Sequence, residues 1–244
     1  MSNAEPRNPF TRKGSFIFGA VLVVVLVLAG ILVAVTSQGR GGGGTTPSAT
    51  PSTPVAVATA TADAEGASAC GLAEYEESGT LSAAPETEWT IVGTMAAPER
   101  TDVGPGVIGD DGVRSCYAHT VEGALFATAN LWAMGTNASL STPILEQLVV
   151  PGPGRDAALA TTYGSSNNGV SAQIAGFKVL SYTADRATID TAFTLNNGTL
   201  SSGAQELQWS DGDWKVVLTD DGKPSYRPVA LQSLGGYISW AGVQ

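Results

Sequence analysis

His119 is the first residue to consider for chemistry, because it is the only histidine in the 244-residue chain. A histidine assisted by a carboxylate can act as a general base, and Asp190 is one carboxylate that could assist it. No spacing in the sequence supports this pair. His119 also precedes a predicted helix, where a neutral imidazole can pack or cap. We therefore favour a structural role for His119 over a catalytic one.

Cys70 and Cys116 are the only two cysteines. They lack a C-x-x-C motif and a recognisable partner histidine, which disfavours a redox or catalytic thiol. A disulfide between them closes a loop of about 46 residues, and the chain-entropy relation gives it about 4 kcal/mol of stabilisation. We expect a structural disulfide. With both thiols paired and one histidine, the sequence also predicts no zinc site.

Four aspartates mark acidic turns near the C-terminus: Asp211, Asp213, Asp220 and Asp221. A D-x-D-G run can suggest calcium, but the twelve-residue loop with its closing glutamate is absent. We expect solvated hairpin turns instead. The glycine-proline runs near residues 104 and 152 lack the frame of a phosphate-binding loop, and no nucleophile motif is present. The sequence therefore predicts no catalytic residue, no cofactor and no metal.

Residues 16–35 form an apolar run without charge or proline. At about 1.5 Å per residue, such a helix is about 30 Å long, which matches the core of a lipid bilayer. Arg7, Arg12 and Lys13 precede the run, so the positive-inside rule predicts a cytoplasmic tail (1–14) and a transmembrane helix (15–37). A cleaved signal peptide is the alternative, but its apolar region spans only about 7–15 residues.

Residues 38–69 are rich in glycine, threonine, proline and serine. This composition buries too little apolar surface to offset the entropy of ordering, so we expect a disordered linker that holds a domain off the membrane. The chain beyond residue 40 has eight basic and 21 acidic residues, a net charge of −13. Nucleic-acid binding requires a basic surface, so this charge argues against a nucleic-acid partner.

The remaining chain divides into a lead-in and a domain. Residues 70–117 carry mainly turn signals, and we expect an irregular segment with one short strand at residues 89–95. In residues 118–244, periodicity predicts helices before strands. Helices followed by an antiparallel meander are an α+β pattern. The expected helices span residues 119–134, 142–149 and 155–163, and the expected strands span residues 171–182, 187–195, 205–209 and 214–218.

Seven residues of this domain are candidates for a pocket or an interface: His119, Trp132, Phe177, Phe193, Trp209, Tyr237 and Trp240. If Trp132, Phe177, Phe193 and Trp209 fill the space between helices and sheet, a ligand cavity there is disfavoured. The C-terminal aromatic residues form either a last core strand or an exposed strip for a partner. We favour the core strand.

Helices followed by a curved sheet, and the W-x-D-G-D-W-K-V hairpin at residues 209–216, resemble the NTF2-like (cystatin-like) cone. A second set of motifs occurs in order along nearly the whole chain. It comprises Cys70-Gly71-Leu72, Trp89, Val103-Gly104-Pro105, Cys116-Tyr117-Ala118-His119-Thr120 and Gly235-Gly236-Tyr237-Ile238-Ser239-Trp240. In these motifs the chain is similar to uncharacterised actinobacterial single-pass membrane proteins of integrative and conjugative elements. Its architecture also resembles the VirB8/TcpC class of conjugation-channel subunits, although it has room for only one such domain.

The resemblance implies a non-enzymatic, membrane-anchored scaffold or assembly subunit of an envelope complex, as in conjugative (type IV secretion-like) transfer. We expect a single-pass cell-membrane protein with an extracytoplasmic C-terminal domain. Its expected partners are the lipid bilayer, through residues 15–37, and envelope proteins or further copies of itself. An extracytoplasmic ligand-binding or sensory domain is the first alternative. A cone-type isomerase or hydrolase is the second, and it requires His119 or an aspartate buried in a pocket.

Overall fold

The computed structural model describes residues 60–61, 66–161 and 171–242. The predicted cytoplasmic tail (1–14) and transmembrane helix (15–37) lie outside these ranges, and no helix within the ranges is long and apolar enough to cross a membrane. Most of the predicted linker (38–69) also lies outside. Of its described residues, Ala60 and Thr61 form β1 (Ala60–Thr61), which pairs with β2 (Glu74–Tyr75), and the backbone N–H of Ala69 donates to the carbonyl of Gly212.

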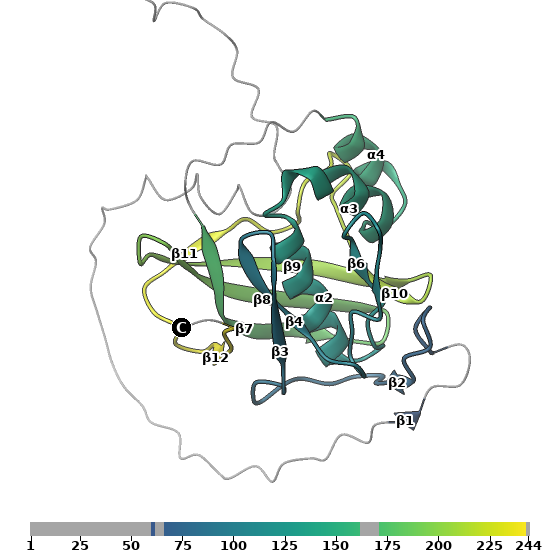
Figure 1. The fold of residues 1–244 in the computed structure, drawn as a ribbon, viewed down its shortest axis with the longest axis horizontal. Helices are drawn as coiled ribbons and strands as arrows, with labels where there is room; N and C mark the ends of the chain where they lie inside the picture. The colour runs from purple at the N-terminus through teal and green to yellow at the C-terminus, as the bar shows by residue number, and fades with distance from the viewer. Residues whose placement is uncertain (1–59, 62–65, 162–170, 243–244) are drawn as a thin grey trace, which may run out of the picture.

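An antiparallel sheet of six strands forms one layer of the described residues (Figure 1). Its longest strands are β7 (Ala172–Tyr182), β8 (Arg186–Leu195) and β9 (Leu200–Ser210). The second of these strands is where the alternation predicts it, with Ile189 and Phe193 buried and Thr194 exposed. The alternation of burial is incomplete, however, because Thr188 and Ala192 on the opposite face are also buried. The predicted turn after β8 places Gly198 at a φ of +81°, a conformation that glycine adopts without strain.

The outer edge of β9 is shared by two strands. β10 (Asp213–Val216) pairs with the C-terminal part of β9, and β11 (Val229–Leu231) pairs with its N-terminal part. β9 therefore begins at Leu200 and not at residue 205 as predicted, because its first residues pair with β8 on one edge and with β11 on the other. On the other side of the sheet, β12 (Ile238–Ser239) pairs with β7. The predicted sheet of about four strands is thus extended by β11 and β12.

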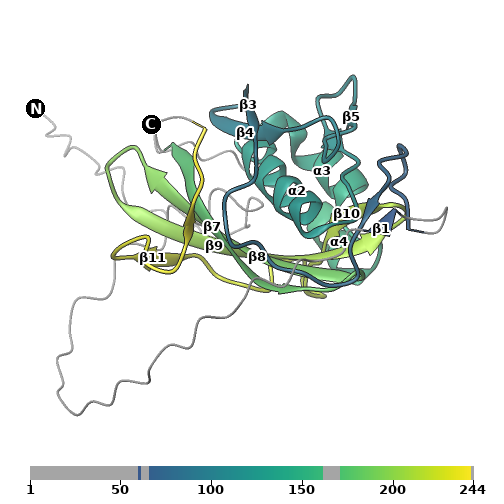
Figure 2. The same ribbon diagram turned by 90° about the horizontal axis from the view of Figure 1, so that it is seen from below.

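Helix α2 (Val121–Met134) lies on one face of this sheet and organises the core. Figure 2 shows the curved sheet with α2 and the hairpin of β3 and β4 on the same side of it. The helix begins as predicted, since the Thr120 hydroxyl accepts the N–H of Gly123 at 3.0 Å and caps the first turn. Thirteen of its 14 residues are buried, so the helix is enclosed by its neighbours rather than lying on a surface.

Three shorter helical segments follow α2: η1 (Ala138–Leu140), α3 (Ser141–Leu148) and α4 (Pro153–Leu159). The second and third predicted helices are confirmed, although α4 ends at Leu159 and not at residue 163. Ile144, Leu145 and Leu148 form the buried face of α3, which packs against α4 and β10. Proline at the first position of α4 suits a helix start, because that N–H has no acceptor within the helix.

The lead-in (70–117) is more regular than the sequence predicts. The single strand expected at residues 89–95 is wrong: β3 (Glu88–Val92) and β4 (Met95–Glu99) form a hairpin that reverses at Gly93, where φ is +61°. The buried residues of β4 pack against α2, which stabilises a pair too short to persist alone. β5 (Val107–Ile108) and β6 (Arg114–Ser115) form a second short hairpin.

The described residues thus form an α+β fold, as predicted. Helices and short hairpins cover one face of an antiparallel sheet. Among the described residues, the core is continuous from α2 to the three long strands and includes the C-terminal Trp240.

Candidate interaction site

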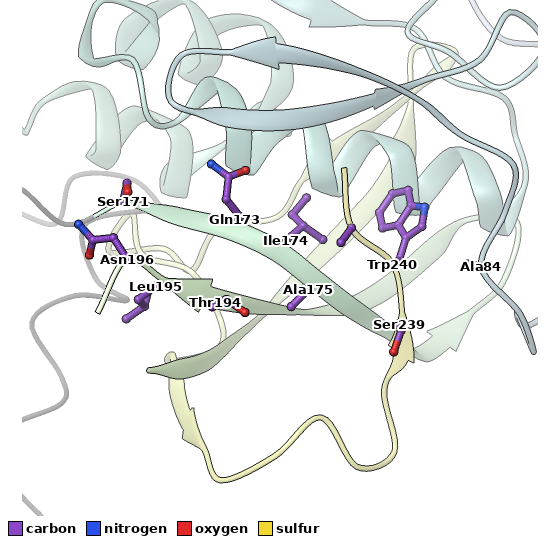
Figure 3. Close-up of a pocket in the computed structure, with 11 residues that line it drawn as sticks. Ala84, Ser171, Gln173, Ile174, Ala175, Thr194, Leu195, Asn196, Ser239 and Trp240 are labelled. Carbon is purple, nitrogen blue, oxygen red and sulfur yellow. The ribbon is translucent and has the colours of Figure 1, made fainter. Parts of the chain in front are cut away.

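A groove of about 790 Å³ opens at the edge of the sheet, where the chain leaves β12 beside β7 (Figure 3). Its solvent-accessible apolar residues are Ala84, Ala175 and Ala241, with the nearly buried Ile174, Leu195 and Trp240 behind them. Serine, threonine and amide side chains supply the polar part. None of the residues that line it is charged. They are Ala84, Ser171, Gln173, Ile174, Ala175, Thr194, Leu195, Asn196, Ser239, Trp240 and Ala241.

Trp240 joins this groove to the core. Its indole lies 4.8 Å from the ring of Trp89 and 5.6 Å from that of Phe177, measured between centroids. Its ring nitrogen donates to the hydroxyl of Thr87 at 2.9 Å. Only 5% of the residue is exposed. Trp240 therefore behaves as a core residue, as favoured from the sequence, and forms a rigid wall of the groove.

Gln173 links the start of β7, which borders the groove, to the hairpin of β3 and β4. Its side-chain oxygen accepts the N–H of Ala96 at 3.0 Å, and its side-chain nitrogen donates to the carbonyl of Thr94 at 2.8 Å. The amide thus pairs with backbone as a neighbouring strand would. Figure 3 shows Gln173 extending from β7 toward this hairpin. Because both ends of its amide are engaged, Gln173 fixes the shape of the groove.

The pairing of β12 with β7 ends within the groove. Ile238 lies opposite Phe177 and Ser239 opposite Gly176, and the N–H of Trp240 donates to the carbonyl of Ala175. A methyl group on Gly176 would lie 2.7 Å from the carbonyl oxygen of Ile238, so this close approach requires glycine. Beyond this point, among the residues that the structure describes, no strand pairs with the first residues of β7 on this edge, and they border the groove.

Three of the predicted pocket residues fill the space between helix and sheet. Trp132 projects from α2 onto β9, and a methyl group on Gly203 would lie 2.7 Å from its indole. Phe193 meets the Trp132 ring edge-on, with centroids 4.9 Å apart. Phe177 is fully buried beside Trp240. The interior is therefore packed with side chains, and the groove at the sheet edge lies outside it.

Trp209 and His119 form a separate aromatic contact. Their rings stack with centroids 3.7 Å apart and planes inclined by 6°. His119 is buried, and its ring nitrogens face the carbonyls of Gly66 and Ala184. The Asp190 carboxylate instead accepts the Tyr237 hydroxyl at 2.5 Å. The structure therefore does not bring His119 and Asp190 together, and the general-base pair considered from the sequence is not formed.

Tyr237 lies on the sheet through contacts with two neighbouring strands. The ammonium of Lys178 lies 4.3 Å from its ring centroid, and its hydroxyl donates to Asp190. Burial and this hydrogen bond raise the pKa of Tyr237 to about 12. Together with Trp240, this residue shows that the C-terminal aromatic segment packs against the sheet.

The predicted disulfide between Cys70 and Cys116 is confirmed. Beside it, Asp213 corrects an expectation, because it is buried and not part of a solvated turn. Its carboxylate accepts the backbone N–H groups of Cys116 (2.7 Å), Tyr117 (3.0 Å) and Trp214 (2.8 Å). Burial raises the pKa of Asp213, and the three donors oppose that effect. Asp213 thus ties β10 to the disulfide-linked segment.

Within the described ranges, no group of three or more histidine, cysteine, aspartate or glutamate side chains is arranged to hold a metal ion. Gln173 and Asp213 are the structurally important residues that sequence reasoning missed. A single glutamine in a predicted strand gives no indication that its side chain bonds to a distant hairpin. For Asp213, the position directly before a strand tryptophan was the available clue, since it places the carboxylate at the start of a buried strand.

The fold and the groove define a class: an α+β domain with a filled interior and an uncharged groove at one sheet edge. The chain belongs to the family described as a domain of unknown function (DUF8175), which matches residues 49–239. No curated protein and no solved structure matches it.

Proposed function

We propose that this chain is a non-enzymatic, membrane-anchored scaffold or assembly subunit of an envelope complex, in which an NTF2-like cone binds partner proteins. The filled interior is the observation that carries this proposal. Trp132, Phe177 and Phe193 occupy the space where a cone would hold a ligand, which leaves the outer surfaces for binding. The curvature of the sheet around α2 supports the NTF2-like assignment, and the apolar run at residues 16–35 supports the anchor.

The groove beside β7 is the surface that we assign to a partner. Its occupant is an extended, uncharged segment of an envelope protein. Strand addition supplies main-chain hydrogen bonds at a sheet edge, and pockets for alternate side chains supply specificity. The groove offers an edge where β12 stops pairing and an apolar lining that includes Ala175 and Ala241. Its lack of charge, on a domain with a large acid excess, disfavours a charged segment because burying an unpaired charge is costly.

A photo-crosslinking residue at position 194 tests this assignment in intact membranes of the native host. Thr194 lines the groove and is exposed. Thr183 is the matched control, since it is also an exposed threonine but lies at the opposite end of the β7–β8 hairpin. We expect a protein adduct from position 194 and none from position 183. Absence of an adduct at 194, or equal adducts at both positions, would contradict the assignment.

The ligand-binding alternative rests on the volume of the same groove. It predicts that a small molecule from the envelope fraction protects position 194 from crosslinking and co-purifies with the chain. Substituting the exposed Thr194 by tryptophan, which would fill the groove, would then reduce the amount of that molecule. A protein adduct without such a molecule favours the scaffold.

A further inference from the structure

The outer edge of β9 has a gap between the two short strands that pair with it (Figure 1). β10 pairs with residues 207–210 and β11 pairs with residues 200–202. Next to β10, the N–H of Val217 donates to the carbonyl of Glu206 at 3.0 Å. Within the part of the chain that the structure describes, no strand pairs with residues 203–205 on this edge. The gap therefore lies in the middle of β9.

Ala204 presents its backbone polar groups to this gap. In an antiparallel sheet, the N–H and C=O of one residue bond to the strand on one side, and those of the next residue bond to the other side. The carbonyl of Glu206 bonds to Val217 on the outer edge. The N–H and C=O of Ala204, two residues earlier, therefore point to the same edge. They meet no strand there, and unpaired backbone groups in a protein interior are costly.

The segment that crosses the gap does not replace the missing strand. It connects β10 to β11, and Pro224, Tyr226 and Pro228 of this segment face residues 203–205 across a cavity of about 10 Å³. Trp132 of α2 forms the rest of the lining. Proline has no N–H, so two of the three facing residues have no backbone donor for the carbonyl of Ala204.

Two buried side chains that line this cavity hold polar atoms without a hydrogen-bond partner among the described residues. They are the indole Nε1 of Trp132, a donor, and the side-chain Oε1 of Gln205, an acceptor. Trp132 is 3% exposed and Gln205 is 1% exposed. The amide nitrogen of Gln205 donates to the carbonyl of Glu206 at 3.4 Å, so its oxygen is the end that lacks a partner. Folded proteins rarely leave such groups unpaired.

We propose that one ordered water molecule occupies this cavity and bridges α2 to the edge of β9. The water accepts the indole N–H of Trp132 and donates to Oε1 of Gln205. Its second hydrogen and second lone pair bond to the C=O and N–H of Ala204. Buried waters make two to four such bonds, and about 10 Å³ is the smallest volume that admits one. The volume excludes a larger ligand, and the lining residues carry no charge to hold an ion.

The water takes the place of a strand residue at this edge. It pairs the backbone of Ala204, which would otherwise be open to strand addition from another chain. This site does not depend on the scaffold role proposed above, because its evidence comes from the opposite side of the sheet from the groove.

Nuclear Overhauser spectroscopy with selective excitation of water tests the site directly. The full chain, labelled with ¹⁵N-tryptophan and held in lipid nanodiscs, has five indole N–H groups, and Trp132→Phe identifies the signal of Trp132. We expect this signal to show a cross-peak to water with the sign of a long-lived contact. Trp214 is the internal control, because it is also buried but its indole N–H donates to the carbonyl of Ala118. Absence of the cross-peak at Trp132, or equal cross-peaks at both residues, would overturn the proposal.

The hydroxyl of Tyr226 exchanges protons with water and could imitate this signal. Tyr226→Phe removes the hydroxyl and keeps the ring that lines the cavity. The cross-peak at Trp132 should persist in this variant. Its loss would identify the hydroxyl as the source and overturn the proposal.

The substitution Gln205→Met tests the acceptor, because it keeps the side-chain length and removes the oxygen. If a water bonds to this oxygen, the folded-to-unfolded ratio should fall about tenfold. If the oxygen has no partner, its removal should stabilise the chain instead. Gln208→Met is the matched control in the same strand, since the oxygen of Gln208 accepts from the exposed Arg186 at 3.1 Å and should change the ratio less than about threefold. A gain in stability for Gln205→Met, or equal effects of the two substitutions, would overturn the proposal.

Discussion

Asp213 offers the sharpest test of how the domain is held together, through the substitution Asp213→Ala. The change removes the only carboxylate that accepts the N–H groups of Cys116 and Tyr117, which are 3% and 2% exposed. A hydrogen bond to a charged acceptor contributes about 1.5–3 kcal/mol. Two such long-range bonds, less the cost of burying the carboxylate, give an expected destabilisation of about 3 kcal/mol. That is a large part of the 5–15 kcal/mol typical of a whole domain.

Equilibrium unfolding of the full chain in denaturant, followed by tryptophan fluorescence, measures this loss. Asp211→Asn is the matched control, because Asp211 lies in the same turn at a φ of +56°, which asparagine also tolerates. Asp211 is exposed, and its carboxylate bonds to Lys215 and Ser210. The control should change the free energy of unfolding by less than about 0.5 kcal/mol. A loss below 1 kcal/mol for Asp213→Ala, or equal losses for the two variants, would refute the assigned role of Asp213.

Three further predictions concern stability. Replacing Cys70 and Cys116 by serine should cost about 4 kcal/mol through the lost loop constraint, and an unchanged denaturation midpoint would contradict this. Gly203→Ala forces a methyl group to within 2.7 Å of Trp132 and should cost about 1–3 kcal/mol. Gly79→Ala, where the nearest atom is 3.6 Å away, is its control, and equal unfolding curves for the two would count against the packing described. The raised pKa of Tyr237, about 12, means that the folded state favours the protonated phenol. Wild-type stability should therefore be intact below about pH 10 and decline toward pH 12, whereas Tyr237→Phe should decline less. Parallel declines would refute this.

The long elements of the fold were predictable because each carries its own periodic signal. The alternation of Ile189 and Phe193 with polar residues places β8, and Thr120 marks the start of α2. These signals act over a few residues, and tertiary packing reinforces them. The disulfide was predictable for a different reason, since two cysteines allow only one pairing.

The elements that the sequence does not reveal depend on partners far along the chain. The sequence predicts one strand where β3 and β4 lie, because Gly93 stands between two apolar segments. The chain reversal at Gly93 is stabilised by packing of β4 on α2, which the local sequence does not show. β11 and β12 are two or three residues long and exist because longer strands accept them. The groove could not be predicted for the same reason. Gln173 and Trp240 come from opposite ends of the sheet-forming region, and no local sequence pattern connects them.

The enclosure of α2 restricts how this family can diverge. With 13 of its 14 residues buried, any gain in side-chain volume along the helix must be matched by a loss in β4, in the sheet or in the C-terminal segment that packs on it. Substitutions there should occur in compensating pairs among homologous chains. If the proposed scaffold role holds, partner specificity can change freely only on surfaces outside this enclosure. New binding preferences should then arise at the sheet edges and loops while the central helix stays nearly constant.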